Sequence, residues 1–205
     1  MADPAMQARS PLAGHLAPGR HGRAEGLPGL RLEERGGIAA AAIAARAGQA
    51  ASLAVRLQGS FGLALPQRPG CAVAGDVELI WSGPAQWLAF DPGRAGVARF
   101  GFAQDLARKL GDAASVTDLT GARAVLRLTG PAVRETLCKL LPIDLDETVF
   151  PPGAAALTLA SHIGVTLWRP TASAWDIACY RSFGESLAEA VLEAAAEFGC
   201  TIATA

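Results

Sequence analysis

The sequence predicts an α+β fold built from two split β-α-β (ferredoxin-like) half-domains, preceded by an extended N-terminal arm over residues 1–36. Short alternating apolar runs indicate strands, apolar residues at helical spacing indicate helices between them, and the same order of elements starts again after residue 119. We therefore expect one α+β domain over residues 37–205, with half-domains at about 37–119 and 120–205.

The first 36 residues are rich in Gly, Pro and Arg and show no hydrophobic periodicity. Such a segment resembles an extended arm more than a folded element. Leu12 and Leu16 lie among turn-forming residues within it. Ordering of the arm against another subunit and simple disorder are both open from the sequence.

The first half-domain is expected to follow the order β-α-β-β-α-β. Gly59 and Gly111 are predicted to end its two helices, because glycine readily adopts the left-handed conformation found at helix ends. From the apolar patterns we predict strands over 37–46, 76–81, 86–90 and 114–119, and helices over 49–59 and 102–110.

The second half-domain begins with the alternating run "ARAVLRL", which predicts a strand over 122–128. The sequence S-x-x-E formed by Ser182 and Glu185 is a capping-box pattern ahead of the last helix. After a helix over 132–141, strands are expected over 154–160, 163–168 and 174–180, then a helix over 186–198 and a short closing strand over 200–204.

Thr129, Gly130 and Pro131 connect the strand over 122–128 to the helix that follows. Proline is favoured at the first helical position and glycine permits a tight turn, so a structural corner explains the motif. A phosphate cradle at the helix N-terminus is the alternative. The additional glycines of a dinucleotide fingerprint and the Gly-Lys-Ser/Thr ending of a P-loop are missing from the motif, which favours the corner.

Composition and charge argue against membrane and nucleic-acid partners. The longest apolar run near the start, "IAAAAIAA" over 38–45, is too short to span a bilayer, and the first residues carry no apolar h-region of a secretory signal. The net charge is -1, and Lys109 and Lys139 are the only lysines. A soluble cytoplasmic protein is the expectation.

We predict no catalytic, cofactor-binding or metal-binding residue in this chain. The cysteines are too widely spaced for a zinc or redox motif and are interpreted as buried free thiols: Cys71, Cys138, Cys179 and Cys200. The histidines lack an identifiable acid-base partner and are expected at the surface: His15, His21 and His162.

Two further groups of residues are interpreted structurally. The acidic cluster of Asp144, Asp146 and Glu147 does not match a calcium loop and is expected to form a solvated turn. The tryptophans could stack on a heterocyclic ligand, but more often such residues fill a core or an interface: Trp81, Trp87, Trp168 and Trp175.

The run "DLTGARAVLRLTGPAVRETLCKLLPIDLDETVFPPGAA" resembles the D-[LV]-S, strand, G-P-x-A, helix and F-x-x-G pattern of the folate-binding aminomethyltransferase superfamily. With "GPAQWLAF" upstream, "RSFGESLAEAVLEAAAEFG" downstream, and "RSPLAG" and "GLRLEERGG" near the start, the chain resembles the gamma subunits of heterotetrameric sarcosine oxidases. The resemblance extends roughly from Arg9 to Gly199.

This resemblance implies a structural or assembly subunit of a complex with alpha, beta and delta subunits. Such a complex demethylates sarcosine oxidatively to glycine, produces hydrogen peroxide and passes the one-carbon unit to tetrahydrofolate. FAD, FMN, NAD, zinc and tetrahydrofolate are then implied for the partner subunits. The alternative is a free-standing tetrahydrofolate-binding or aminomethyl-transfer protein.

Asp118 is the candidate for a folate-binding residue, because the superfamily orients the pterin with an acidic side chain. An aspartate ahead of Thr120 and Gly121 can equally hydrogen-bond its own turn. We therefore assign no folate-binding role to Asp118.

Overall fold

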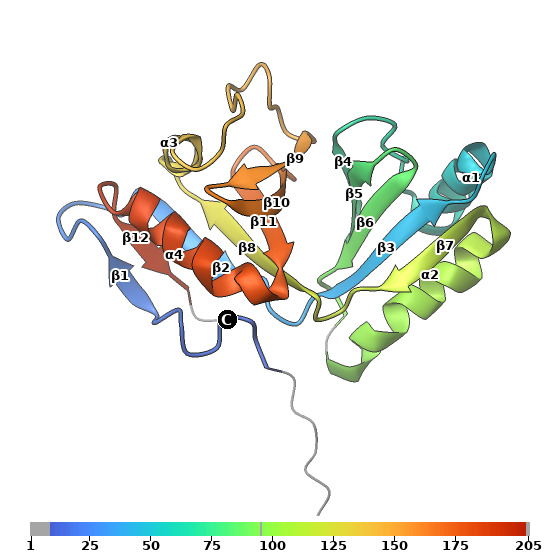
Figure 1. Cartoon of the computed structure of the whole chain (residues 1–205), viewed down its shortest axis with the longest axis horizontal. Coiled ribbons are helices and arrows are strands. Elements are labelled where there is room, and N and C mark those ends of the chain that lie inside the picture. The colour runs from blue at the N-terminus through green and yellow to red at the C-terminus, as the bar shows by residue number, and fades with distance from the viewer. Residues whose placement is uncertain (1–8, 95, 204–205) are drawn as a thin grey trace, which may run out of the picture.

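The protein is an α+β fold with two β-sheets, seen in a computed structural model that describes residues 9–94 and 96–203. The two sheets lie side by side, with helices on their outer faces (Figure 1). The predicted fold class is confirmed. No helix in the described part of the chain is both long and apolar enough to cross a bilayer.

The first half-domain forms a five-stranded sheet in the order β4-β5-β6-β3-β7. The short helices η1 (Gly96–Gly101) and η2 (Gly111–Ala113) flank α2. The other elements are β3 (Ala39–Ala45), α1 (Ala50–Phe61), β4 (Cys71–Ala74), β5 (Val77–Gly83), β6 (Gln86–Asp91), α2 (Phe102–Leu110) and β7 (Ala114–Asp118).

Two details of this half-domain differ from the sequence expectation. Strand β4 is additional; it is a four-residue edge strand whose side chains are half-buried or exposed, so it lacks a clear apolar alternation. Helix α1 continues past Gly59 and ends at Gly62, which has a φ of 68° in the left-handed region. Gly59 lies on the exposed face of α1, where a helix tolerates glycine at a modest cost.

The second half-domain repeats the element order of the first. Its elements are β8 (Arg123–Thr129), α3 (Val133–Cys138), β9 (Ala155–Ala160), β10 (Ile163–Trp168), β11 (Ala174–Tyr180), the short helix η3 (Arg181–Phe183), α4 (Gly184–Ala195) and β12 (Cys200–Ile202). Both halves therefore read β-α-β-β-β-α-β. The predicted strands over 163–168 and 174–180 have the bounds that the structure shows.

The structure corrects the prediction of an extended N-terminal arm, because the described part of this segment folds onto the second half-domain. Strand β2 (Leu30–Glu34) lies between β8 and β12, antiparallel to β8 and parallel to β12, and β1 (Gly19–His21) pairs with β12 at the sheet edge. Leu30 and Leu32 are buried while Arg31 is exposed, an alternation typical of a strand. Residues 1–8 of the predicted arm lie outside the described residues.

The capping box at Ser182 is also wrong. The chain enters α4 through η3, the N-cap is Phe183, and no side chain of the described residues caps the helix. Glu185 instead pairs with His15, whose Nδ1 lies 2.6 Å from its carboxylate. The sequence pattern could not show that the N-terminal segment supplies a partner for this glutamate.

The core consists of two layers beneath the helices and a third between the sheets. Helices α1 and α2 cover one sheet, and α3 and α4 the other. Between the sheets, Phe90 stacks on the fully buried Trp168 with ring centroids 5.4 Å apart. Trp87 and Trp175 are buried as well, and Trp81 is half-buried, so the core interpretation of the tryptophans is confirmed.

Gly130 is required by both conformation and packing. Its φ is 118°, and a Cβ at this position would lie 2.5 Å from the carbonyl oxygen of Gly29, just before β2. That carbonyl accepts a hydrogen bond of 3.0 Å from the amide of Ala132. Pro131 precedes the N-cap, Ala132, rather than occupying the first helical position as expected. The motif is a corner that fits against the inserted strand.

Candidate functional site

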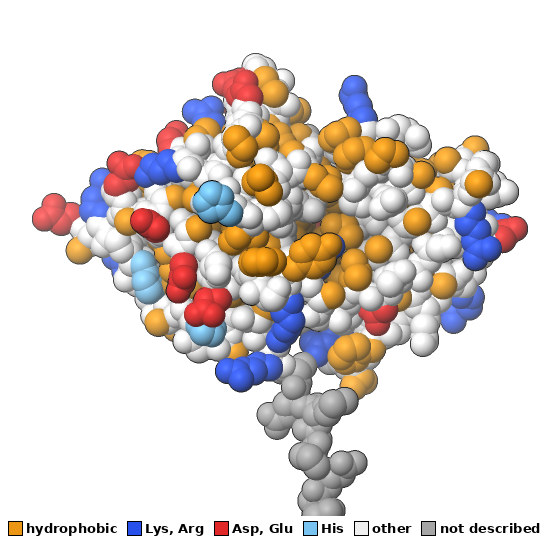
Figure 2. All heavy atoms as spheres, viewed as in Figure 1, with side chains coloured by type: hydrophobic (Ala, Val, Ile, Leu, Met, Phe, Trp, Pro, Cys, Tyr) orange, Lys and Arg blue, Asp and Glu red, His pale blue; other side chains and the backbone are white. Residues whose placement is uncertain are grey.

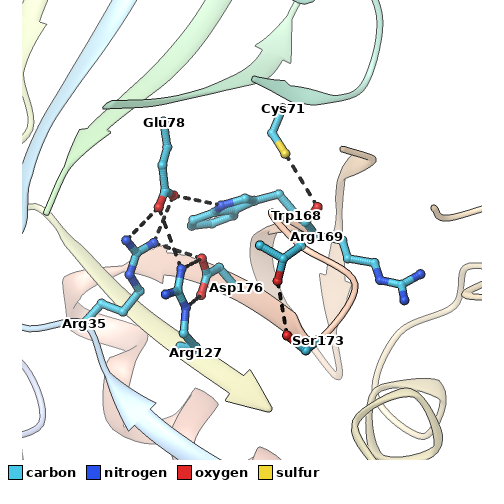
Figure 3. Close-up of polar contacts among 9 residues, drawn as sticks. Arg35, Cys71, Glu78, Arg127, Trp168, Arg169, Ser173 and Asp176 are labelled. Atoms are coloured by element: carbon cyan, nitrogen blue, oxygen red, sulfur yellow. Dashed lines mark hydrogen bonds and ion pairs between the residues drawn. The ribbon is translucent and has the colours of Figure 1, made fainter. Parts of the chain in front are cut away.

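Four charged side chains meet between the two sheets and form the central polar cluster (Figure 3). They come from the segment after β2, from β5, from β8 and from β11, and are Arg35, Glu78, Arg127 and Asp176. The cluster thus joins residues of both half-domains. Side-chain exposure is 7% for Arg35 and Glu78, 30% for Arg127 and 0% for Asp176.

Arg35 bridges the two acidic residues. Its Nη2 donates to Oε1 of Glu78 at 2.7 Å, and its Nη1 donates to Oε2 at 3.0 Å. The same Nη1 donates to Oδ2 of Asp176 at 2.9 Å. The planar guanidinium fork fits a carboxylate with two parallel bonds, which a lysine could not reproduce.

Arg127 is the second partner of Asp176. Residues 127 and 176 are direct cross-strand partners on β8 and β11. Nε and Nη2 of Arg127 donate to the two carboxylate oxygens of Asp176 at 2.8 and 2.7 Å. Trp168 completes the cluster by donating from Nε1 to Oε2 of Glu78 at 3.1 Å. Every carboxylate oxygen of the cluster therefore accepts at least one hydrogen bond.

The electrostatics of the cluster balance burial against pairing. Burial raises the pKa of the Asp176 carboxyl above its ordinary value, while the hydrogen bonds from Arg127 and the charge of Arg35 oppose the rise. For Arg127, the hydrogen bonds to Asp176 raise the pKa of the guanidinium, and burial opposes this rise without cancelling it. Two cations and two anions cancel, so the cluster presents no net charge.

This arrangement fastens the half-domains together. All four of its carboxylate oxygens are bound within the cluster, and removing one member of a buried ion pair costs far more than the pair itself contributes. None of the four residues was predicted from the sequence as a site residue. The available signal was a charged residue inside an otherwise apolar strand, as in "VELIW", "AVLRL" and "AWDIACY".

Asp118 is engaged in its own turn, as interpreted from the sequence. Its Oδ1 accepts a hydrogen bond of 2.8 Å from the amide of Thr120. The hydroxyl of Thr120 in turn lies 3.1 Å from the amide of Ala40 on β3 and 3.3 Å from its carbonyl. Asp118 therefore orders the connection from β7 to β8.

The acidic cluster forms exposed turns, as expected. Asp144 accepts from the amide of Asp146, and Asp146 accepts from the amide and hydroxyl of Thr148. Glu147 pairs with Arg169 at 2.8 Å. Within residues 9–94 and 96–203, no three His, Cys, Asp or Glu side chains gather closely enough to hold a metal ion.

The histidine and cysteine expectations hold in part. His15 and His162 are exposed and His21 is half-buried. The thiols of Cys179 and Cys200 are buried, and that of Cys71 is half-buried. Cys138, at the end of the six-residue α3, is exposed and corrects the expectation of four buried thiols.

Comparison with known proteins assigns the family. Residues 39–197 match the family model described as the sarcosine oxidase, gamma subunit family. The chain belongs to that family. Within the family, it is 37% identical over 143 residues to the sarcosine oxidase subunit gamma of Corynebacterium sp. (strain P-1), covering 68% of each chain. It is 34% identical over 145 residues to that of an Arthrobacter species, covering 69% of each.

The fold supports the same family. A chain of the heterotetrameric sarcosine oxidase from Corynebacterium sp. U-96, solved in complex with pyrrole 2-carboxylate, superposes with a TM-score of 0.75 and 28% identity, over 93% of this chain and 96% of that one. The glycine cleavage system aminomethyltransferase T from Bartonella henselae superposes with a TM-score of 0.61 and 15% identity, over 85% of this chain and 48% of that one. This second likeness concerns the fold.

Proposed function

We propose that this gamma-family chain is a structural subunit of a heterotetrameric sarcosine oxidase complex and carries no catalytic residues of its own. The supporting observation is its near full-length superposition on a chain of such a complex. The central polar cluster agrees with this role, because its charged groups are paired with one another and join the half-domains.

The complex in this proposal also contains alpha, beta and delta subunits and acts in the cytoplasm. It demethylates sarcosine oxidatively to glycine, yields hydrogen peroxide and transfers the one-carbon unit to tetrahydrofolate. FAD, FMN, NAD, zinc and tetrahydrofolate belong to the partner subunits in this proposal.

The edge strand β9 offers a contact surface for a partner subunit of that complex. Leu157 and Leu159 point to the same side of the strand and are 50% and 51% exposed. Apolar side chains on an exposed strand edge are a typical protein-binding feature and an aggregation risk when left uncovered. Figure 2 shows apolar side chains gathered over the middle of one face, where the half-domains meet.

Co-purification tests this proposal. The tagged full-length chain is expressed together with the genes that neighbour its own, and the eluate is examined by gel electrophoresis and flavin absorbance. We expect stoichiometric co-elution with larger flavin-containing polypeptides. Recovery of the chain only as an unassociated monomer would contradict the proposal.

A matched pair of variants locates the contact. Leu159→Glu places a charge on the exposed edge of β9 and is expected to reduce recovery of the partner polypeptides at least tenfold. Val55→Glu makes the same kind of change on the exposed face of α1 and serves as the control. Equal recovery with both variants would remove β9 as the contact.

The alternative, a free-standing tetrahydrofolate-binding or aminomethyl-transfer protein, stays a prediction from sequence resemblance. Calorimetric titration of the full chain with a reduced folate separates it from the subunit role. Absence of heat and of thermal stabilisation at high ligand excess would exclude that alternative.

A further inference from the structure

A cavity of about 470 Å³ opens where the two half-domains and the N-terminal segment meet. It is bounded by residues 9–11, by the passage from β2 to β3, by the end of η1 and by the connection from β7 to β8. Figure 2 shows basic side chains at the lower middle of the displayed face, beneath the junction of the half-domains. Neither the sequence motifs nor the proposed subunit role accounts for this cavity.

The cavity wall is strongly basic. Among the described residues it contains one carboxylate, Glu34, and five arginines: Arg9, Arg35, Arg99, Arg123 and Arg181. Arg35 is neutralised by Glu78 and Asp176, and Glu34 accepts a hydrogen bond from the hydroxyl of Ser10 at 2.6 Å. The remaining guanidinium groups leave a clear excess of positive charge.

Arg99 and Arg123 are the least compensated of these groups. Neither forms an ion pair with any described residue, and the buried Nε of each lacks a hydrogen-bond acceptor among them. Their guanidinium carbons lie over aromatic rings instead, with Cζ of Arg123 4.0 Å from the ring centroid of Tyr180 and Cζ of Arg99 4.9 Å from that of Phe100. Stacking fixes a guanidinium plane while its edge donors stay available for a ligand.

The backbone beside these arginines is kept free of side chains. Gly37 has a φ of +70°, and a Cβ there would lie 3.1 Å from Nη1 of Arg99. Gly121, with a φ of +83°, lines the cavity on the side of Arg123. Glycine at position 37 leaves room for the guanidinium of Arg99 beside the cavity, whereas at Gly121 a Cβ would meet nothing within 4 Å and the positive φ is what favours glycine.

We propose that this cavity binds a small organic oxyanion, with Arg99 and Arg123 as its principal ligands. A cleft lined by one sign of charge concentrates ions of the opposite sign, and guanidinium forks match the geometry of carboxylate and phosphate groups. Arg181 and Arg9 also line the cavity and add to its positive field. The shared chemistry is that of a carboxylate or a phosphate ester.

The test is a thermal-shift and calorimetric titration of the full-length chain with citrate and with inorganic phosphate, at an ionic strength held constant with sodium chloride. We expect a saturable rise in Tm with at least one of them. A response to citrate alone assigns carboxylate ligands, a response to phosphate alone assigns phosphate ligands, and a response to both confirms general oxyanion binding.

Matched variants tie the binding to the cavity. Arg99→Gln and Arg123→Gln are each expected to raise the apparent Kd at least tenfold while keeping the native circular dichroism spectrum. Arg46→Gln is the control, because Arg46 is an exposed arginine beyond the other end of β3, roughly 20 Å from the cavity. Absence of any saturable response beyond chloride, or an equal loss in the Arg46 variant, would overturn the proposal.

Discussion

Arg35 and Asp176 lie 141 positions apart in the sequence, and Nη1 of the arginine donates to the carboxylate of the aspartate at 2.9 Å. The same guanidinium holds Glu78 from the other sheet. One side chain from the segment before the first half-domain thereby joins strands of both sheets. The connection explains why a segment of arm-like composition is part of the folded unit.

Asp176→Ala is expected to lower the free energy of unfolding by about 3–5 kcal/mol, because Arg35 and Arg127 would then share only Glu78. Urea denaturation followed by circular dichroism measures the change. Asp112→Ala is the control, since it breaks the surface pair with Arg56, whose Nη2 lies 2.6 Å from the aspartate carboxylate. A loss no larger than that of the control would contradict a stabilising role for the cluster.

Gly130→Ala and Gly59→Ala are expected to change stability in opposite directions. At Gly130 the new Cβ meets the Gly29 carbonyl and the φ is positive, so we expect a loss of about 1–3 kcal/mol. At Gly59, inside α1, a Cβ meets nothing within 4 Å, and we expect a gain of about 0.5–1 kcal/mol. Thermal denaturation of both variants measures these changes. A change in stability of the same sign in both variants would contradict the prediction.

Leu12→Ala is expected to cost about 2–5 kcal/mol in the free energy of unfolding, because Leu12 is 2% exposed and belongs to the core of the second half-domain. Leu27→Ala provides the control, since Leu27 is 88% exposed. Chemical denaturation measures both. If Leu12→Ala left stability unchanged, the N-terminal segment would not belong to the folded core.

The thiols are expected to react at very different rates. Burial and the nearby negative charges of Glu78 and Asp176 raise the pKa of Cys71 to about 12, and burial raises the pKa of Cys179 and Cys200 to about 11. A raised thiol pKa lowers the thiolate fraction at pH 8, and thiolate is the reactive form. Exposed Cys138 should therefore be alkylated first.

Iodoacetamide labelling followed by mass spectrometry measures these rates. Cys138→Ser should remove the fast phase, and urea should make the other three cysteines reactive. Raising the pH from 8 toward 10 should accelerate Cys71 by roughly tenfold per pH unit, because its thiol stays well below its pKa of about 12 throughout this range. Rapid labelling of Cys71 in the native chain at pH 8 would refute the predicted protection.

Regular apolar patterns allowed much of the fold to be predicted from sequence. The strands over 163–168 and 174–180 were predicted with the observed bounds, because their side chains are nearly all buried and hydrophobic. The repeat of element order and the family resemblance pointed to the same two-part architecture. Short elements such as β4 and β2 were missed, since four or five residues give little periodic signal.

The central polar cluster could not have been predicted in the same way. Glu78, Arg127 and Asp176 are unusual only as charges inside apolar strands, and Arg35 follows a strand, but nothing in the sequence shows that these four residues meet. Arg99 and Arg123 likewise give no local sign that they line one cavity. Both groupings depend on contacts between residues separated by up to 141 positions.

The sequence by itself determined the fold class, the family and the positions of most helices and strands, because these depend on local patterns of apolar residues, glycine and proline. Only the tertiary structure decided that residues 30–34 enter the second sheet and that charged side chains join the two half-domains. Strand pairing and ion pairing are satisfied by whichever partners the whole fold brings together, and a linear pattern does not contain that information.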